Sequence, residues 1–135
     1  MALLNPQLWP EQEWRSLSEA LELLDATAQR KLARHLVDQT TRAVLAEDPI
    51  AHKVASPVTK AERLRDIEHE LDEAAWMAQD AGDEELYRAR FRQARCASAA
   101  IASRDETASA ALSRTAYEAR HALNDDGAFR RLMET

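Results

Sequence analysis

The fold is decided by residues 59–125, which read TKAERLRDIEHELDEAAWMAQDAGDEELYRARFRQARCASAAIASRDETASAALSRTAYEARHALND. Apolar residues recur in this stretch at spacings of three and four, the period of an α-helix with one buried face. The first stripe consists of Leu64, Ile67, Leu71, Ala74, Ala78 and Ala81, and the last of Ala108, Leu112, Thr115, Ala119 and Leu123. Alanine dominates these stripes, so the helices should approach closely but bury little area per residue. We therefore expect further helices to complete the core.

Start and stop signals divide this stretch into three helices. Thr59 and Glu62 have the spacing of a capping box. Gly82 can take the left-handed conformation that ends a helix, and Asp83 directly after it is a favoured N-cap residue. Asp105 opens a second start signal 22 residues after Asp83. The predicted helices cover residues 59–81, 83–103 and 105–124. Turns this short make neighbouring helices antiparallel.

The residues before this stretch add one or two helices. Residues 1–9 are expected to form an N-terminal arm, and Pro10 with the acids after it starts a helix. The apolar stripe of this helix is Trp14, Leu17, Leu21 and Leu24. Residues 10–47 form either one helix or two. We favour a break near Asp25, because a helix spanning the whole range would greatly exceed the mean length of about 11–12 residues.

Two segments connect or follow the predicted helices. Residues 48–58 contain two prolines and are interpreted as a crossover loop, with a functional loop as the alternative. Residues 126–135 form a C-terminal tail that can be a short helix, with Phe129, Leu132 and Met133 docked on the bundle. Residues 1–135 are thus predicted to be a single all-α domain. Its architecture is expected to be an up-and-down antiparallel bundle of four to five helices.

Composition restricts the classes of function. The 135 residues carry a formal charge of −6, which makes nucleic acid an unlikely partner. The sequence has no apolar run of the roughly 20 residues that span a membrane, and its N-terminus does not resemble a signal peptide. A single cysteine fits a reducing compartment, so we expect a cytoplasmic protein. Arginine outnumbers lysine by 15 to 3, which is typical of GC-rich bacterial genes.

Catalytic and metal-binding patterns are weak. Asp66 and His69 have a metal-ligand spacing, as do Glu118 and His121, but both pairs point away from the apolar stripes of their helices. Cys96 lies near two arginines that could favour a thiolate, although a small residue on a crowded helix flank is the favoured interpretation. The sequence shows no glycine-rich phosphate loop and no Ser-His-Asp order. We therefore expect no cofactor and no metal, and we favour a non-catalytic protein.

Tryptophans are the first candidates for partner binding. Trp76 lies almost opposite the apolar stripe of its own helix. Either the N-terminal helix folds over it with Trp9 and Trp14, which we favour, or Trp76 is exposed as an interface anchor.

Arginines of the middle helix are the second group of candidates. An outward stripe could meet an acidic partner, but we favour its pairing with acids of a neighbouring helix such as Glu62, Asp66 and Glu73. This stripe consists of Arg88, Arg92 and Arg95. Arg90 falls instead on the apolar face near Tyr87, where it must be paired or must line a ligand pocket. We favour a structural pairing for Arg90.

Together these features predict a non-catalytic helical protein-interaction module, such as a bacterial cytoplasmic regulator or adaptor. One alternative is an immunity- or antitoxin-like protein that neutralises a basic partner. Another is a small-ligand-binding bundle with a pocket near Arg90 and Tyr87. A protein partner is expected, and homodimerisation is a further option because the alanine stripes leave some helix faces without obvious cover.

Overall fold

The computed structural model describes the backbone of residues 11–133 and the side chains of residues 15–133. Within these residues the chain is all helical and contains no strand. Its seven helices are α1 (Glu11–Glu22), α2 (Ala26–Val44), α3 (Ala51–Ala55), α4 (Ala61–Asp80), α5 (Glu84–Ala102), α6 (Ala108–Leu123) and α7 (Asp126–Met133). The predicted all-α class is confirmed, whereas the predicted count of four to five helices is not.

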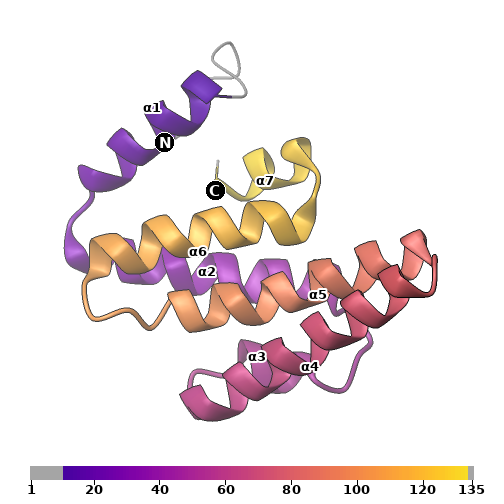
Figure 1. Ribbon diagram of the computed structural model, residues 1–135. Coiled ribbons are helices and arrows are strands. Elements are labelled where there is room, and N and C mark those ends of the chain that lie inside the picture. The colour runs from indigo at the N-terminus through magenta and orange to yellow at the C-terminus, as the bar shows by residue number, and fades with distance from the viewer. Residues whose placement is uncertain (1–10, 134–135) are drawn as a thin grey trace.

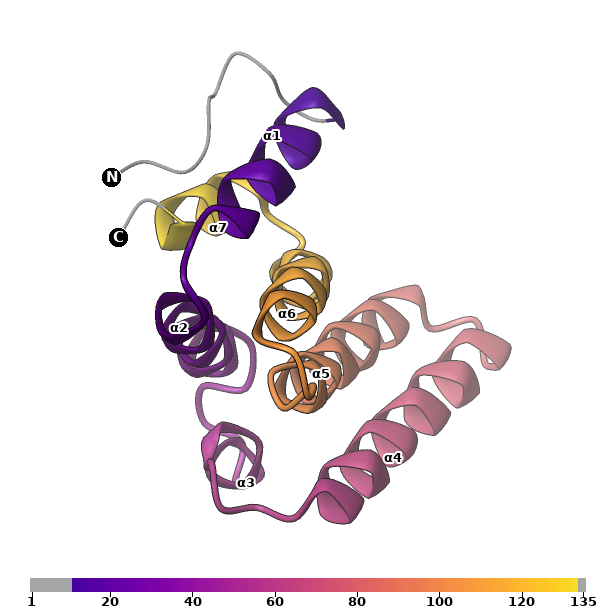
Figure 2. The same ribbon diagram turned by 90° about the vertical axis from the view of Figure 1, so that its left-hand side faces the viewer.

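The long helices pack side by side, with α5 between α4 and α6 (Figure 1, Figure 2). The pairs α4/α5 and α5/α6 are antiparallel hairpins, as their short turns predicted. Helix α2 lies against α6 and α5, and it runs in the same direction as α6. Helices α1 and α7 cover the side of α6 that faces away from α4, as both views show (Figure 1, Figure 2).

Helix α5 is enclosed along its C-terminal half. Seven of its residues are buried, and each of them has a small side chain: Ala94, Cys96, Ala97, Ser98, Ala99, Ala100 and Ala102. Small side chains allow backbones to approach closely, so helices α2, α3, α4 and α6 all reach α5. The close helix packing expected from the alanine stripes is therefore present. It involves four helices around α5, more than an apolar stripe on one face of α5 predicted.

Two apolar clusters make up the core of the described residues. The first joins α1, α2, α6 and α7, and its large members are Leu17, Leu21, Leu36, Leu112, Leu123, Phe129 and Met133. The second joins α2 to α5 through Val37, Leu45, Val54, Leu64 and Ile67, together with the small residues of α5. The C-terminal tail thus forms α7 and contributes Phe129 and Met133 to the first cluster, one of the arrangements that the sequence allowed.

Several local signals in the sequence are confirmed. The carboxylate of Asp25 accepts a hydrogen bond from the N–H of Ala28 at 2.8 Å, so a capped break separates α1 from α2. Gly82 has a φ of 79° and ends α4 in the left-handed region. Asp83 then caps α5 by accepting from the N–H of Leu86 at 3.1 Å.

Three predicted boundaries are wrong. Thr59 does not cap α4: the N-cap residue is Lys60, which makes no side-chain cap, and the carbonyl of Thr59 is instead held by Arg104. Helix α6 begins two residues later than expected, because Thr107 rather than Asp105 is its N-cap residue. Residues 48–58 are not a simple loop, since they contain the one-turn helix α3 with Val54 buried in the core.

Candidate functional site

Asp72 of α4 and Arg95 of α5 meet across the α4–α5 hairpin. Trp76 follows Asp72 by one helical turn and therefore lies on the same flank of α4. Tyr87 and Phe91 precede Arg95 at spacings of four along α5. We call these five residues the hairpin face.

Arg95 holds the inner end of the hairpin face. One of its terminal nitrogens lies 2.8 and 2.9 Å from the two carboxylate oxygens of Asp72, and the other lies 3.7 Å from Glu118 of α6. The guanidinium group also stacks over the ring of Phe91, 5.0 Å from its centroid. The three charged side chains are only about one-fifth exposed. Arg95 therefore fixes α4, α5 and α6 relative to one another at this point.

The surroundings of Arg95 are acidic. Glu68 accepts a hydrogen bond from Ser98 and adds a third carboxylate to those of Asp72 and Glu118. Burial raises the pKa of Glu118 and Glu68 raises it further, although Arg95 acts in the opposite direction. The Nε–H of Arg95 is buried and has no hydrogen-bond partner among the described residues. The network therefore has a fixed geometry and a surplus of negative charge.

The outer end of the hairpin face is aromatic. Tyr87 and Phe91 lie with their ring centroids 6.1 Å apart, and both are partly buried. Trp76 is 59% exposed. Here the α4–α5 hairpin extends past the ends of α2 and α6 (Figure 1). Tryptophan, tyrosine and arginine are the residue types that dominate binding energy in protein interfaces.

The expectation that the N-terminal helix covers Trp76 is wrong. Helix α1 places Leu17 and Leu21 in the cluster with α6 and α7, on the opposite side of the molecule from α4 (Figure 1). Trp9 lies outside the described residues, and so does the side chain of Trp14.

The predicted arginine stripe separates into three different environments. Arg88 is exposed and pairs with Glu84 on its own helix at 3.5 Å. Arg92 donates to the backbone carbonyl oxygens of Ala122 and Leu123, at 2.8 and 2.9 Å. These are carbonyls of the last turn of α6, where a cation is favoured. Arg92 is thus built into the fold, and Arg95 is the member of the stripe that belongs to the hairpin face.

The predicted acidic partners of the stripe are also wrong. Glu62, Asp66 and Glu73 were expected to pair with it, but the acids that contact Arg95 are Asp72 and Glu118. The cause is the angular position of α4, which turns Asp72 toward α5. Glu73 pairs instead with His69 on its own helix, at 3.3 Å.

Arg90 and Tyr87 line neither of two depressions in the surface of residues 15–133. Arg90 is half-buried and donates to Gln93, one turn further along α5, at 2.8 Å. One depression, of about 530 Å³, lies between the end of α2 and α3, and the other, of about 470 Å³, lies beside the α5–α6 turn.

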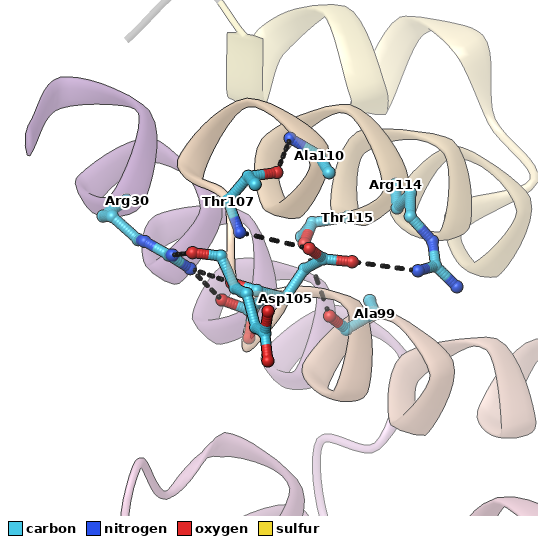
Figure 3. Close-up of polar contacts among 9 residues, drawn as sticks. Arg30, Ala99, Asp105, Thr107, Ala110, Arg114 and Thr115 are labelled. Carbon is cyan, nitrogen blue, oxygen red and sulfur yellow. Dashed lines mark hydrogen bonds and ion pairs between the residues drawn. The ribbon is translucent and has the colours of Figure 1, made fainter. Parts of the chain in front are cut away.

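The α5–α6 turn is held by side chains of the chain itself (Figure 3). Arg30 of α2 donates to the carbonyl oxygens of Asp105 and Glu106, at 2.6 and 2.7 Å. The carboxylate of Asp105 accepts from the N–H of Thr107 at 3.2 Å and from Arg114 at 3.0 Å. A carboxylate therefore already lies at the start of α6, where an external anion would otherwise bind.

Nucleophilic and metal chemistry find little support in the described residues. Cys96 is buried, its sulfur lies 3.9 Å from the carbonyl oxygen of Thr40, and burial raises the pKa of its thiol to about 12. No group of three histidine, cysteine, aspartate or glutamate residues within residues 15–133 could hold a metal ion. Thr115 donates to the carbonyl of Ala99 at 3.5 Å, so this inward hydroxyl is structural (Figure 3).

Sequence reasoning missed two members of the hairpin face, Asp72 and Phe91, and the contact of Glu118 with Arg95. Phe91 carried a usable signal, because it lies one turn after Tyr87 and one turn before Arg95. Asp72 and Glu118 carried none, since their partner lies on another helix.

Comparison with known proteins adds no relative: no family model, no curated protein and no solved structure matches this chain. Among the described residues, none of the helices combines the length and the apolar character needed to cross a membrane.

Proposed function

We propose that this chain is a non-catalytic helical protein-interaction module, a regulator or adaptor of the bacterial cytoplasm, and that it binds its partner through the hairpin face. The observation that carries the proposal is the exposure of Trp76, at 59%, one helical turn from Asp72, which pairs with Arg95. When a partner covers a large exposed aromatic side chain, much apolar area is removed from water, and this stabilises the complex. Such residues are typical anchors of protein interfaces.

The rigidity of the surroundings supports a binding role. Arg95 is already held by Asp72, Glu118 and the ring of Phe91, so little side-chain freedom would be lost there when a partner docks. Trp76 lies one turn from this network and can serve as the projecting anchor. The face is carried by helix surfaces rather than by either of the two depressions, which favours a macromolecular partner over a small ligand.

Affinity purification from the source organism tests the proposal. Tagged wild-type protein, Trp76→Ala and the control Leu23→Ala are incubated with nuclease-treated lysate, and bound proteins are quantified by mass spectrometry. Leu23 is a suitable control because it is 87% exposed but lies at the end of α1, far from the hairpin face. We expect one protein whose recovery falls about tenfold or more with Trp76→Ala and is unchanged with Leu23→Ala. Equal recovery of every bound protein by all three forms would contradict the proposal.

A further inference from the structure

The connection between α2 and α4 folds back on α2 and forms a depression of about 530 Å³. The second half of α2 forms one wall, and residues 46–49 and helix α3 form the rest. Ligand sites in proteins commonly have volumes of about 300–1,000 Å³. The sequence allowed a functional role for this connection, and the proposed function does not use it. The depression is therefore a candidate site of its own.

The lining of the depression is acidic. It contains three carboxylates and one guanidinium group, those of Asp38, Glu47, Asp48 and Arg42, and with His52 neutral their formal charge is −2. Arg42 pairs with Asp38 at 3.4 Å, so the excess lies on Glu47 and Asp48. Both follow the C-terminus of α2, which adds a partial negative charge of about half a unit. The depression beside the α5–α6 turn, with two carboxylates and three guanidinium groups, has the opposite sign.

A buried hydroxyl group in the lining has no partner. Thr41 lines the depression and is only 2% exposed, and its Oγ1 makes no hydrogen bond within residues 15–133. Nearly all buried polar groups in proteins are hydrogen-bonded, and an unpaired one is unfavourable. A ligand in the depression can supply the missing partner. This observation points to a ligand independently of the charge.

The rest of the lining favours an organic ligand over a metal ion. Ala46, Pro49, Ala51 and Ala55 contribute apolar surface to the depression. A bare metal ion would leave this surface uncovered, and within residues 15–133 no group of three histidine, cysteine, aspartate or glutamate residues could hold one. An organic cation places its charge at the carboxylates and its carbon skeleton on the apolar surface.

We propose that this depression binds a small organic cation, a primary amine. Its ammonium group pairs with Glu47 and Asp48, and a polar group of the ligand hydrogen-bonds to the hydroxyl of Thr41. One oxygen of Asp48 accepts from the N–H of Ile50 at 3.0 Å, which orients the carboxylate and leaves the other oxygen for the ligand. The inference goes beyond the proposed function and does not use the hairpin face. The failure of either proposal therefore leaves the other intact.

Titration of small fragments into the isotope-labelled full chain, followed by NMR spectroscopy of the amide groups, tests the inference. The fragments are ammonium, neutral and carboxylate compounds of matched size in equal numbers. We expect ammonium fragments to shift the amide signals of residues 38–56, and neutral and carboxylate fragments to shift them little. The strongest ammonium fragment is then used to compare variants.

Two adjacent threonines provide a matched pair of variants. Thr40 is fully buried and its hydroxyl also lacks a partner within residues 15–133, but Thr40 does not line the depression. Thr41→Val should weaken binding of the ammonium fragment about fivefold or more, and Thr40→Val should change it less than about twofold. Neither change should lower the melting temperature, because each removes a hydroxyl group that is buried without a partner.

A second pair of variants tests the carboxylates. Glu47→Gln/Asp48→Asn removes both charges but keeps an oxygen that can accept from the N–H of Ile50. Glu19→Gln/Glu22→Gln makes the same change of charge at exposed positions of α1. The first should weaken binding of the ammonium fragment about tenfold or more, and the second less than about twofold.

Three outcomes would overturn the inference. The first is that ammonium fragments bind no better than neutral or carboxylate fragments. The second is that the shifted amide signals are centred outside residues 38–56. The third is an equal effect on binding of the two members of either pair of variants, because binding would then not depend on Thr41 or on the carboxylates of Glu47 and Asp48.

Discussion

Replacing Arg92 with methionine should destabilise the fold far more than the same change at Arg88. Arg92 makes two charge-assisted hydrogen bonds to carbonyl oxygens that end α6, those of Ala122 and Leu123. Each such bond contributes about 1.5 kcal/mol. We therefore expect Arg92→Met to lower the free energy of unfolding by about 3 kcal/mol. Arg88 is 72% exposed and pairs within its own helix, so Arg88→Met should cost about 0.5 kcal/mol or less.

Urea unfolding followed by circular dichroism measures this difference. For a slope of about 2 kcal/mol per molar urea, the midpoint should fall by about 1.5 M for Arg92→Met and by about 0.25 M or less for Arg88→Met. Arg92→Lys keeps the charge near the end of α6 but lacks the planar fork that reaches two carbonyls, so its midpoint should lie between these values.

The reasoning is refuted if the midpoints of Arg92→Met and Arg88→Met agree within error at an unchanged slope. Arg92 would then make no net contribution through Ala122 and Leu123. Arg92 would then again be a candidate for partner binding, as the sequence suggested for the outward arginines.

Three further predictions concern the core, the acidic network and the cysteine. Phe129→Ala should cost about 4 kcal/mol because Phe129 is fully buried, whereas Trp76→Ala, with only about two-fifths of the residue removed from water, should cost about 1 kcal/mol, as thermal melts will show. Because burial raises the pKa of Glu118 above its usual 4.5, this group stabilises the fold below that pH, and the contribution is lost as the pH rises through the raised value. Glu118→Gln should therefore not lower the melting temperature at pH 7, and in this variant the melting temperature should decrease less steeply as the pH rises above about 4.5; a clear loss at pH 7 would show that the contact with Arg95 outweighs burial. Cys96, with a pKa of about 12, should react with a thiol reagent at pH 8 only after urea unfolds the chain, and rapid labelling of the native protein would contradict its burial.

Boundaries set by local chemistry were predictable from the sequence. Asp25, Gly82 and Asp83 act through atoms within four residues, so their effect on the backbone can be recognised without the tertiary structure. Thr59 had an equally good local signal, but Lys60 is the N-cap residue and makes no side-chain cap, while Arg104 of the α5–α6 turn donates to the carbonyl of Thr59. The local signal carried no information about this tertiary contact.

The hydrogen-bond acceptors of four arginines could not be predicted from the sequence. Arg30, Arg34, Arg92 and Arg104 all donate to backbone carbonyl oxygens of residues at least 21 positions away in the sequence. Helical periodicity assigns an arginine to a face but does not identify the carbonyl that the face will meet. Backbone acceptors carry no residue-specific signature, so acidic side chains were the natural but mistaken choice of partner.

The exposure of Trp76 on α4 is explained by how burial is distributed along the neighbouring helix α5. The C-terminal half of α5 is enclosed by four helices, whereas the N-terminal half of α5 lies on the projecting hairpin. Only small residues of α4, Ala75 and Ala78, are buried in that part of the pair. The projecting end therefore contributes little apolar area to the core, and changes there should disturb the rest of the fold only slightly. A partner that covers Trp76 would bury apolar surface that the isolated chain leaves exposed. Substitutions that alter the binding surface at this end would therefore leave the core intact.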